Sequence, residues 1–420
     1  MRLLFLTMAD IGNMSDRGIY TDLLREFRAR GDEVYVVTPS ERRHRAPTRL
    51  VTEAGISVLR VRTGNLIKVG MAEKAMSTIL VERQFTSAIA RYFGEIAFDL
   101  VLYSTPPVTF DRVVRYIKRR DGCRSYLLLK DIFPQNAVDL GMIRRGGLVW
   151  RYFRAKEKRL YALSDRIGCM SPANVRYLLD HNPQISAEKV EECPNSIKPL
   201  PLRSREGIDS AIRALHGIPR DCTLLVYGGN LGIPQGLGFL LDVLDACRNR
   251  KDIFFLIVGS GTEYPRIDSH LRAGGQSNAR LVSFLPKEQY DALLVDCDVG
   301  LIFLDPRFTI PNFPARLTAY MEAAMPIIAA TDCSTDIRTV LDESGGGIWV
   351  RNGDLDEFMA AVNRLSADGR LRMETGRRGR RYLETHFTVA RAYDIITARA
   401  PEEPTLKEVA LEVGRDNKTA

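Results

Sequence analysis

The feature that most constrains the fold is an alternation of buried-strand and helical patterns that runs through the chain twice. In the first half, runs of Val, Leu, Ile and Tyr predict strands at residues 3–6, 34–37, 58–61, 100–102 and 126–129. In the second half, similar runs predict strands at residues 224–227, 254–258, 281–284, 300–303, 327–330 and 348–350. Continuous apolar runs separated by helices indicate parallel strands covered on both faces. We therefore expect an α/β fold of two facing, doubly wound parallel-sheet domains.

A polar segment rich in proline separates the two halves. Residues 193–222 contain four prolines, which places a linker near 195–220. A length of 420 residues agrees with more than one domain, since a domain holds roughly 150 residues. We expect an N-terminal domain over 1–200, a C-terminal domain over 201–395 and a polar tail over 396–420. Ligands of such paired domains bind in the cleft, beside the carboxyl ends of the strands.

Composition excludes several classes of protein. The chain is 45% hydrophobic and 27% charged, which is typical of a folded soluble protein and not of a disordered one. No stretch approaches the roughly 20 apolar residues that a spanning helix needs, and the N-terminal MRLLFLTMADIG fits a buried strand better than a signal peptide. Five scattered histidines and seven cysteines without a CxxC pair form no metal-ligand or disulfide pattern. These features predict a cytoplasmic location.

Positive charge is concentrated in the first half of the chain. The net charge is +8, and the excess of Lys and Arg lies within residues 1–200. Its densest stretch is 144–159 (RRGGLVWRYFRAKEKR), where Trp150, Tyr152 and Phe153 stand among the cations. This pattern suits an anionic membrane surface, and it suits a solvated helix face beside a buried aromatic stripe equally well. Nucleic acid is a weaker explanation, because no recognition motif accompanies the charge.

Two glycine-rich turns follow successive strands of the second half. The turn VYGGNLGIPQG contains Gly229, Asn230, Gly232 and Gln235. We expect a helix to begin near Gln235 and to offer free backbone amides to a diphosphate. The turn IVGSGTEY contains Gly259 and Gly261. Neither turn matches the P-loop or the dinucleotide fingerprint, so a tight strand-to-helix turn explains each as well as a ligand does. Two adjacent turns of this kind suggest one ligand lying across the sheet edge.

Two further segments bear on function. Residues 296–298, Asp-Cys-Asp, match the metal-binding Asp-x-Asp of one class of sugar transferases, but we interpret them as a helix-to-strand turn because a buried strand follows. Residues 308–332 predict a loop and then a helix that begins at Arg316. A cation is unfavourable in the first turn of a helix, and a bound diphosphate would offset that cost. An arginine curled back into solvent is an equally good explanation.

Together these segments resemble glycosyltransferase family 4, in particular its bacterial capsule and O-antigen biosynthesis members. In chain order, the resemblance is carried by RGIYTDLLREFRARGDEVYVVT, LYSTPPVTF, LLLKDIFPQNAVDLGM, VEECPNSI, GGNLGIPQG, IVGSGTEY, VSFLPKEQY and NFPARLTAYMEAAMPIIA. It covers nearly the whole chain to about residue 395. It implies the GT-B fold, in which two Rossmann-like domains face each other and the second binds a nucleotide-sugar.

The resemblance also implies roles for particular residues. Those expected to bind the donor are Gly229, Asn230, Gly232, Gln235, Gly259, Gly261, Phe284, Asn312, Phe313, Arg316 and Glu322. Gly18 would belong to an N-terminal glycine loop, and Lys130 would be a catalytic residue that helps to carry the charge of the diphosphate. Asp131 would face the reacting sugar as a catalytic residue, although an N-cap for the following turn explains this aspartate equally well.

The chain departs from the family pattern in two places. Many members have an Arg and a Lys in the first donor loop, where this chain has Asn230 and Gln235. The family's Glu-x7-Glu pair is replaced by Pro311 and Ala319, although Glu322 follows one helical turn later. Backbone amides, Arg316 and Lys130 would then carry the diphosphate charge.

The implied activity is retaining transfer of a sugar from a UDP-linked donor, without a metal or another cofactor. The implied acceptor is a polyprenyl-diphosphate-linked saccharide at the inner membrane face, where the basic N-terminal domain meets anionic lipid. No nucleic-acid partner is expected. A nucleotide-sugar 2-epimerase of the same fold is one alternative, although the chain is poor in the cleft acids and histidines that such enzymes use. A non-catalytic scaffold of a polysaccharide assembly complex is another, and the missing Glu pair favours it.

Overall fold

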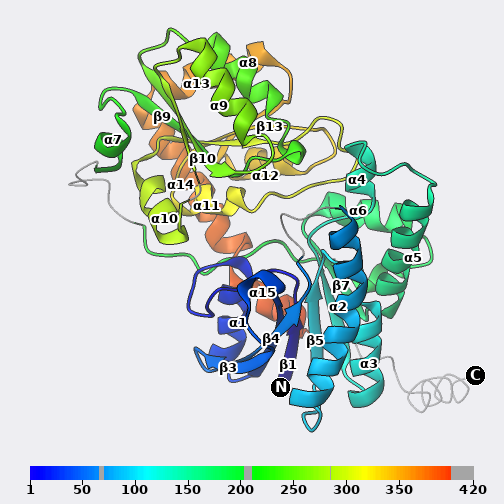
Figure 1. The fold of residues 1–420 in the computed structure, drawn as a ribbon. Helices are drawn as coiled ribbons and strands as arrows, with labels where there is room; N and C mark the ends of the chain where they lie inside the picture. Colours follow the sequence, from blue (N-terminus) through cyan, green and yellow to red (C-terminus); the bar gives the residue numbers. More distant parts are fainter. Residues whose placement is uncertain (66–70, 203–210, 284, 399–420) are drawn as a thin grey trace, which may run out of the picture.

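Two mainly parallel sheets, each covered by helices on both faces, form the protein in a computed structural model (Figure 1). The structure describes residues 1–65, 71–202, 211–283 and 285–398. The first sheet lies in the lower half of Figure 1 and the second in the upper half. The expected α/β fold of two Rossmann-like domains is confirmed.

The first sheet has eight strands in the order β3-β4-β2-β1-β5-β6-β7-β8. Its strands are β1 (Arg2–Leu6), β2 (Glu33–Glu41), β3 (Arg49–Glu53), β4 (Ile56–Thr63), β5 (Leu100–Ser104), β6 (Arg124–Leu129), β7 (Arg166–Cys169) and β8 (Val190–Glu192). Its helices are α1 (Ile19–Ala29), α2 (Met71–Tyr92), α3 (Asp111–Asp121), α4 (Gln135–Asp139), α5 (Leu148–Leu163) and α6 (Pro172–His181). Only β3 is antiparallel to its neighbour. The pattern of apolar runs missed three strands. Strands β7 and β8 are only four and three residues long, and β3 is a largely exposed edge strand.

The second sheet has six parallel strands in the order β11-β10-β9-β12-β13-β14. Its strands are β9 (Thr223–Asn230), β10 (Ile253–Ser260), β11 (Ala279–Val282), β12 (Val299–Phe303), β13 (Ile327–Thr331) and β14 (Gly347–Arg351). Its helices are α7 (Ala211–His216), α8 (Gly238–Ala246), α9 (Tyr264–Gly274), α10 (Lys287–Asp296), α11 (Arg316–Glu322), α12 (Ile337–Ser344), α13 (Leu355–Ala367) and α14 (Gly369–His386). The strand order reverses at β9, so a crevice for a ligand is expected at its carboxyl end.

Burial on both faces explains the continuous apolar runs of the central strands. In β1, Leu4 and Leu6 join one hydrophobic cluster, whereas Leu3 and Phe5 join the cluster on the opposite face of the sheet. All four side chains are completely buried. A strand with only one covered face would instead alternate apolar and polar residues.

The last described helix, α15 (Val389–Thr397), returns to the first domain. Its residues Val389, Ala392 and Ile396 are buried in the cluster that contains Leu3 and Phe5. This packing differs from the expected C-terminal domain over 201–395, because chain order alone does not show where a terminal helix docks. Of the expected tail over 396–420, residues 399–420 lie outside the described residues.

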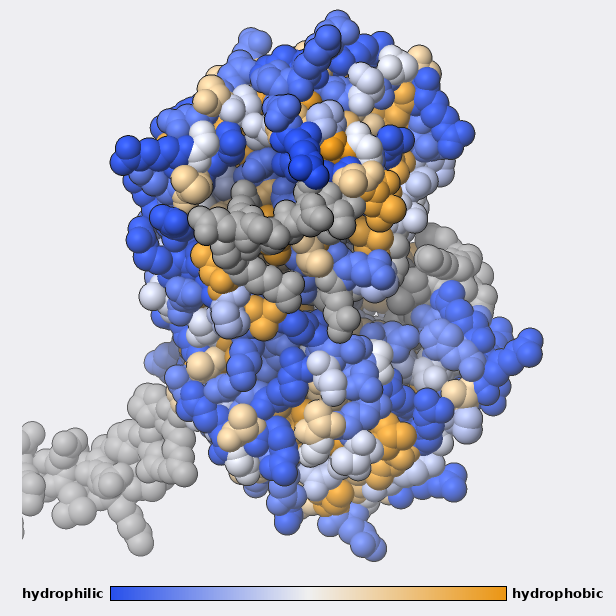
Figure 2. Space-filling model, turned by 90° about the vertical axis from the view of Figure 1, so that its left-hand side faces the viewer, coloured by the Kyte–Doolittle hydropathy of each residue, from blue (hydrophilic) through white to orange (hydrophobic). Residues whose placement is uncertain are grey.

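The hydropathy of the surface and of the helices bears on whether the protein could enter a membrane. In the side view of Figure 2, both lobes are largely hydrophilic, and apolar residues gather in the region between them. In the described part of the chain, no helix has both the length and the apolar character needed to cross a bilayer.

The docking of α15 can be tested by removing one buried side chain. Ile396→Ala should lower the free energy of unfolding by about 2–4 kcal/mol, because truncating a buried Ile loses its transfer free energy and leaves a cavity. Urea denaturation followed by circular dichroism measures this loss. Leu215→Ala, at a side chain that is 77% exposed, should change stability little. Equal effects of the two substitutions would contradict the packing of α15.

Candidate functional site

Arg316, the first residue of α11, lies against the carboxyl end of β9. Its Cζ is 4.4 Å from the centroid of the Tyr227 ring, and its Nη2 donates to Gln235 Oε1 at 2.7 Å. A Cβ placed on Gly229 would lie 3.5 Å from Nη2, so the guanidinium borders the glycine loop. The Nη1 atom is buried and has no hydrogen-bond partner. The side chain therefore does not curl back into solvent, and it holds one unpaired charged donor beside the loop.

Two tyrosines that sequence reasoning missed hold the end of β9 in place. Tyr227 donates its hydroxyl to the carbonyl of Asn230 at 2.8 Å. The Tyr320 hydroxyl accepts from Gly228 N at 3.0 Å and donates to the Val226 carbonyl at 3.3 Å. The position of Tyr227 directly before the two glycines could have indicated a role at the site. A tyrosine in a strand is also an ordinary core residue, so this signal was not specific.

Close packing of the two turns explains their glycines. A Cβ on Gly259 would stand 1.9 Å from the carbonyl oxygen of Gly229, and one on Gly261 would stand 2.2 Å from that of Leu231. A Cβ on Gly232 would stand 2.9 Å from Asn230 Nδ2. Gly229 has φ +127°, a conformation that L-residues rarely adopt. Backbone packing thus supplies a structural reason for Gly259 and Gly261, and backbone conformation supplies one for Gly229, whether or not a ligand also lies here.

The helix expected near Gln235 begins three residues later. A short 3-10 turn over Ile233–Gln235 is followed by Gly236 in the left-handed conformation, and α8 starts at Gly238. The left-handed residue interrupts the helical path, which is why the expected start was wrong. Gln235 instead contributes its side chain, which accepts the hydrogen bond from Arg316.

The loop before α11 reaches across to the first domain. Thr309 donates from its N and its Oγ1 to Asp139 Oδ2 at 2.8 and 2.9 Å. Phe308 and Ile310 are buried in a cluster of the first domain. Asn312 has a buried Nδ2 without a partner, whereas the Phe313 ring packs on Phe387, 5.8 Å between centroids, in the second-domain core. Both residues were expected to bind the donor. The Asn312 amide has a buried donor without a partner, whereas the Phe313 ring is part of the second-domain core.

Asp131 and Lys130 follow β6 and have different surroundings. Both carboxylate oxygens of Asp131 accept from Asn136 Nδ2, at 2.8 and 2.9 Å, and burial raises the pKa of Asp131 to about 6. No side chain caps α4, so the N-cap explanation does not hold. Lys130 lines a small cavity with Tyr20 and Cys193, and burial lowers its pKa. Its Nζ has no hydrogen bond or ion pair within the described residues.

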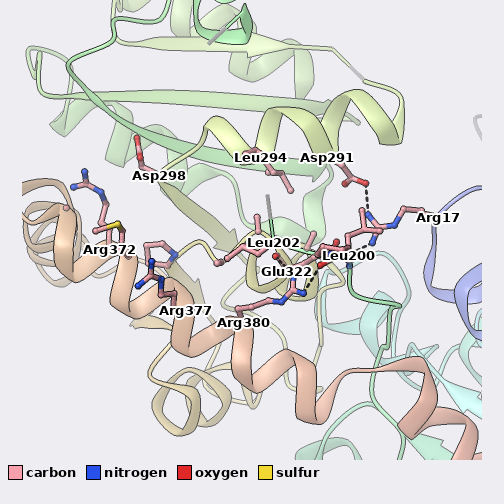
Figure 3. A pocket seen from close by; sticks show the side chains of 18 residues that line it. Arg17, Leu200, Leu202, Asp291, Leu294, Asp298, Glu322, Arg372, Arg377 and Arg380 are labelled. Atoms are coloured by element: carbon pink, nitrogen blue, oxygen red, sulfur yellow. Dashed lines mark hydrogen bonds and ion pairs between the residues drawn. The ribbon is translucent and has the colours of Figure 1, made fainter. Parts of the chain in front are cut away.

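Glu322, at the opposite end of α11 from Arg316, joins the domains. Its Oε1 accepts from Arg17 Nη2 at 2.6 Å and from Leu200 N at 2.8 Å, and Arg17 Nη1 also donates to Asp291 at 2.9 Å (Figure 3). These residues line a cavity of about 560 Å³ between α10, α11, α14 and the linker. Arg17 directly precedes Gly18, the N-cap residue of α1. The carboxylate expected to bind the donor is therefore occupied by an interdomain ion pair.

The remaining expectations concern the Asp-Cys-Asp motif and Phe284. Helix α10 ends at Asp296 and β12 begins at Val299, so the helix-to-strand turn is confirmed. Asp298 Oδ2 accepts from Arg213 Nη2 at 2.9 Å and from Leu224 N at 2.8 Å, which is a structural use of this carboxylate. Over 1–65, 71–202, 211–283 and 285–398, no three His, Cys, Asp or Glu residues form a group that could hold a metal ion. Phe284 lies outside the described residues.

Comparison with known proteins matches part of the second domain to a family. Residues 222–368, which include the glycine turns and Arg316, match the family model described as Glycosyl transferases group 1. Over these residues the chain is similar to the group 1 glycosyl transferases, and this match confirms the resemblance noted from the sequence.

Two curated relatives extend the match beyond the second domain. The probable glycosyltransferase WbjE of Pseudomonas aeruginosa is 24% identical over 254 residues, which are 59% of this chain and 61% of that protein. The putative colanic acid biosynthesis glycosyl transferase WcaI of Escherichia coli K12 is 25% identical over 302 residues, 70% of this chain and 69% of that protein. The chain thus aligns with about three fifths of the length of the first relative.

Solved structures share the fold along nearly the whole chain. Sucrose-phosphate synthase from Thermosynechococcus elongatus superposes with a TM-score of 0.72 at 16% identity, covering 99% of this chain and 98% of that one. HepE of Anabaena in complex with UDP superposes with a TM-score of 0.66 at 14% identity, covering 94% and 98%. At these identities the likeness shows the GT-B fold alone.

The interdomain ion pair can be measured by a double-mutant cycle. Arg17→Ala, Glu322→Ala and the double variant should give a coupling free energy of about 1–2 kcal/mol in urea denaturation, because the two groups share one network and are only 22% and 13% exposed. The exposed α9 pair Asp268 and Arg272 provides the control, with an expected coupling of about 0.3–0.5 kcal/mol. Additive effects at Arg17 and Glu322 would contradict a tie between the domains.

Proposed function

We propose that the protein is a retaining glycosyltransferase that moves a sugar from a UDP-linked donor to a lipid-linked saccharide in cell-surface polysaccharide biosynthesis. The observation that carries the proposal is the unpaired Nη1 of Arg316 beside the Gly229 loop. A buried charged donor without a partner is costly, and an anionic ligand at this position offsets the cost. The match of residues 222–368 to the group 1 glycosyl transferase model and the UDP complex of HepE, which shares the fold, support a nucleotide-sugar as that ligand.

Arg316 stabilises the charge that develops on the leaving diphosphate. A guanidinium is planar, stays charged at all working pH values and presents paired donors to phosphate oxygens. Tyr227 on one side and Gln235 on another hold the group in one orientation before the donor arrives. Preorganised donors of this kind favour the transition state because they need no rearrangement during reaction. We propose that Arg316 and the loop amides serve without a metal ion or another cofactor.

Asp131 faces the reacting sugar from the first domain in this proposal, and Lys130 adds positive charge near the diphosphate. Asn136 fixes the Asp131 carboxylate through both oxygens. In its ionised form the carboxylate stabilises the positive charge that builds up on the sugar ring during glycosyl transfer. With a pKa of about 6, Asp131 is mostly ionised at neutral pH.

The acceptor side of the proposal involves a membrane. The basic stretch 144–159 forms most of α5, and at its start Leu148 and Val149 are 85% and 56% exposed. Exposed apolar side chains beside cations suit the surface of an anionic bilayer. We propose that the first domain lies on the inner membrane face and receives a polyprenyl-diphosphate-linked acceptor there.

Arg316→Ala tests the carrying observation. The variant should bind UDP roughly 10–100-fold more weakly than the wild type, since a hydrogen bond to a charged group contributes about 1.5–3 kcal/mol. Isothermal titration calorimetry measures the affinity. Arg272→Ala, at a 79% exposed side chain of the same domain, should bind UDP as the wild type does. An unchanged affinity in Arg316→Ala would remove this arginine from the donor site.

The raised pKa of Asp131 predicts the pH dependence of turnover. Because the ionised carboxylate is the active form, turnover at saturating donor should fall as pH drops through about 6. Asp131→Asn should lower turnover across the whole range, lose the acidic limb and leave donor affinity nearly unchanged. A pH–rate profile of both proteins measures this. Persistence of the limb in the variant would assign it to another group, such as Asp332, whose pKa burial also raises to about 6.

A further inference from the structure

One face of α3 carries three arginines that the sequence analysis did not single out. Arg112, Arg115 and Arg119 follow one another at helical spacing, so their side chains leave the same side of the helix. All three are exposed. Together with Arg159 of α5 they line an open surface cavity of about 620 Å³. We call this cavity, with its four arginines, the α3 groove.

The four arginines of the α3 groove have no acidic partner in the part of the chain that the structure describes. Within the described ranges, none of their side chains makes a hydrogen bond or an ion pair. The one acid that lines the groove, Asp111, is buried and accepts from Lys156 Nζ at 2.7 Å. Arg120, which also lines the groove, is paired with Asp121. The groove therefore presents several like charges to solvent, an arrangement that a bound anion stabilises.

The α3 groove adjoins a second cationic surface with apolar side chains. Helices α3 and α5 lie next to each other in the first domain (Figure 1). On α5, the side chains of Arg151 and Lys158 are exposed and likewise make no hydrogen bond or ion pair with the described residues. Near the start of α5, Met142 and Leu148 are 61% and 85% exposed. Cations and apolar side chains thus share one side of the domain.

We infer that the α3 groove binds the phosphate groups of anionic phospholipids and holds the first domain on a bilayer. From Arg112 to Arg119 the charges extend over roughly 10 Å of helix, which matches several neighbouring headgroups better than one free phosphate. Nucleic acid does not call for exposed Met and Leu beside the cations, whereas a bilayer interface accommodates both. The inference deepens the membrane part of the proposed function and rests on it, and the evidence that it adds is the row of Arg112, Arg115 and Arg119 on α3, outside 144–159.

A vesicle sedimentation assay tests the α3 groove. The wild type should bind vesicles of phosphatidylglycerol and phosphatidylcholine, bind pure phosphatidylcholine poorly, and lose affinity as salt rises. Each basic residue near an anionic surface raises the partition coefficient roughly fivefold, so the triple variant Arg112→Gln, Arg115→Gln, Arg119→Gln should bind about a hundredfold more weakly. The matched control replaces three exposed arginines of the second domain, Arg364, Arg378 and Arg381, by Gln and should bind as the wild type does.

Additional variants and competitors distinguish phospholipid binding from binding of free phosphate or of DNA. Conversion of the three α3 arginines to Lys should keep vesicle binding, and circular dichroism should show that every variant is folded. Vesicle binding by the Gln variant equal to that of the control would overturn the inference. So would inhibition of vesicle binding by micromolar pyrophosphate, or binding of duplex DNA that the Gln variant loses while it keeps vesicle binding. UDP titration of the same variants reports separately on the donor site, so failure of the proposed transfer and failure of the groove give different results.

Discussion

The candidate donor site depends on the way the Arg316 guanidinium is held at the start of α11. Packing on Tyr227 and a hydrogen bond to Gln235 fix the group at the carboxyl end of β9, and its Nη1 remains without a partner. The first turn of a helix already repels a cation, so this position combines two unfavourable terms. An anion bound at the glycine loop, as proposed, would relieve both.

The same helix and the loop before it connect this site to the first domain. At the end of α11, Glu322 is paired with Arg17, next to the Gly18 loop. Ahead of α11, Thr309 is bonded to Asp139, eight residues after Asp131. The position of the donor-side arginine is thereby coupled to the first domain at both ends of one segment. The family's two glutamates are absent at Pro311 and Ala319, and the nearby Glu322 carboxylate accepts from Arg17 and from Leu200 N.

The sequence predicted the fold well because buried parallel strands have a strong pattern. Most central strands were located from apolar runs, whereas the exposed edge strand β3 and the docking of α15 left no such signal. At the candidate site, the sequence singled out the glycine turns, Arg316 and its partner Gln235, but not Tyr227 or Arg17. Tyr227 and Arg17 act through contacts between segments distant in the chain, and spacing along a sequence does not report those contacts. The left-handed Gly236, which delays the start of α8, was missed for a related reason, since glycine is compatible with a helix or a turn.

The proposal that a nucleotide-sugar binds beside Arg316 is tested most directly by a thermal-shift screen. The purified protein is screened against UDP-, GDP-, ADP- and dTDP-sugars, with magnesium and with EDTA. A ligand at about 100 times its Kd stabilises the folded state by roughly 2.7 kcal/mol, which is readily measured as a rise in Tm. We expect a rise with UDP-sugars that is the same in EDTA and that falls to about half or less in Arg316→Ala, as a 10–100-fold weaker affinity requires. No rise with any nucleotide-sugar, or a rise that Arg316→Ala retains in full, would contradict the proposal.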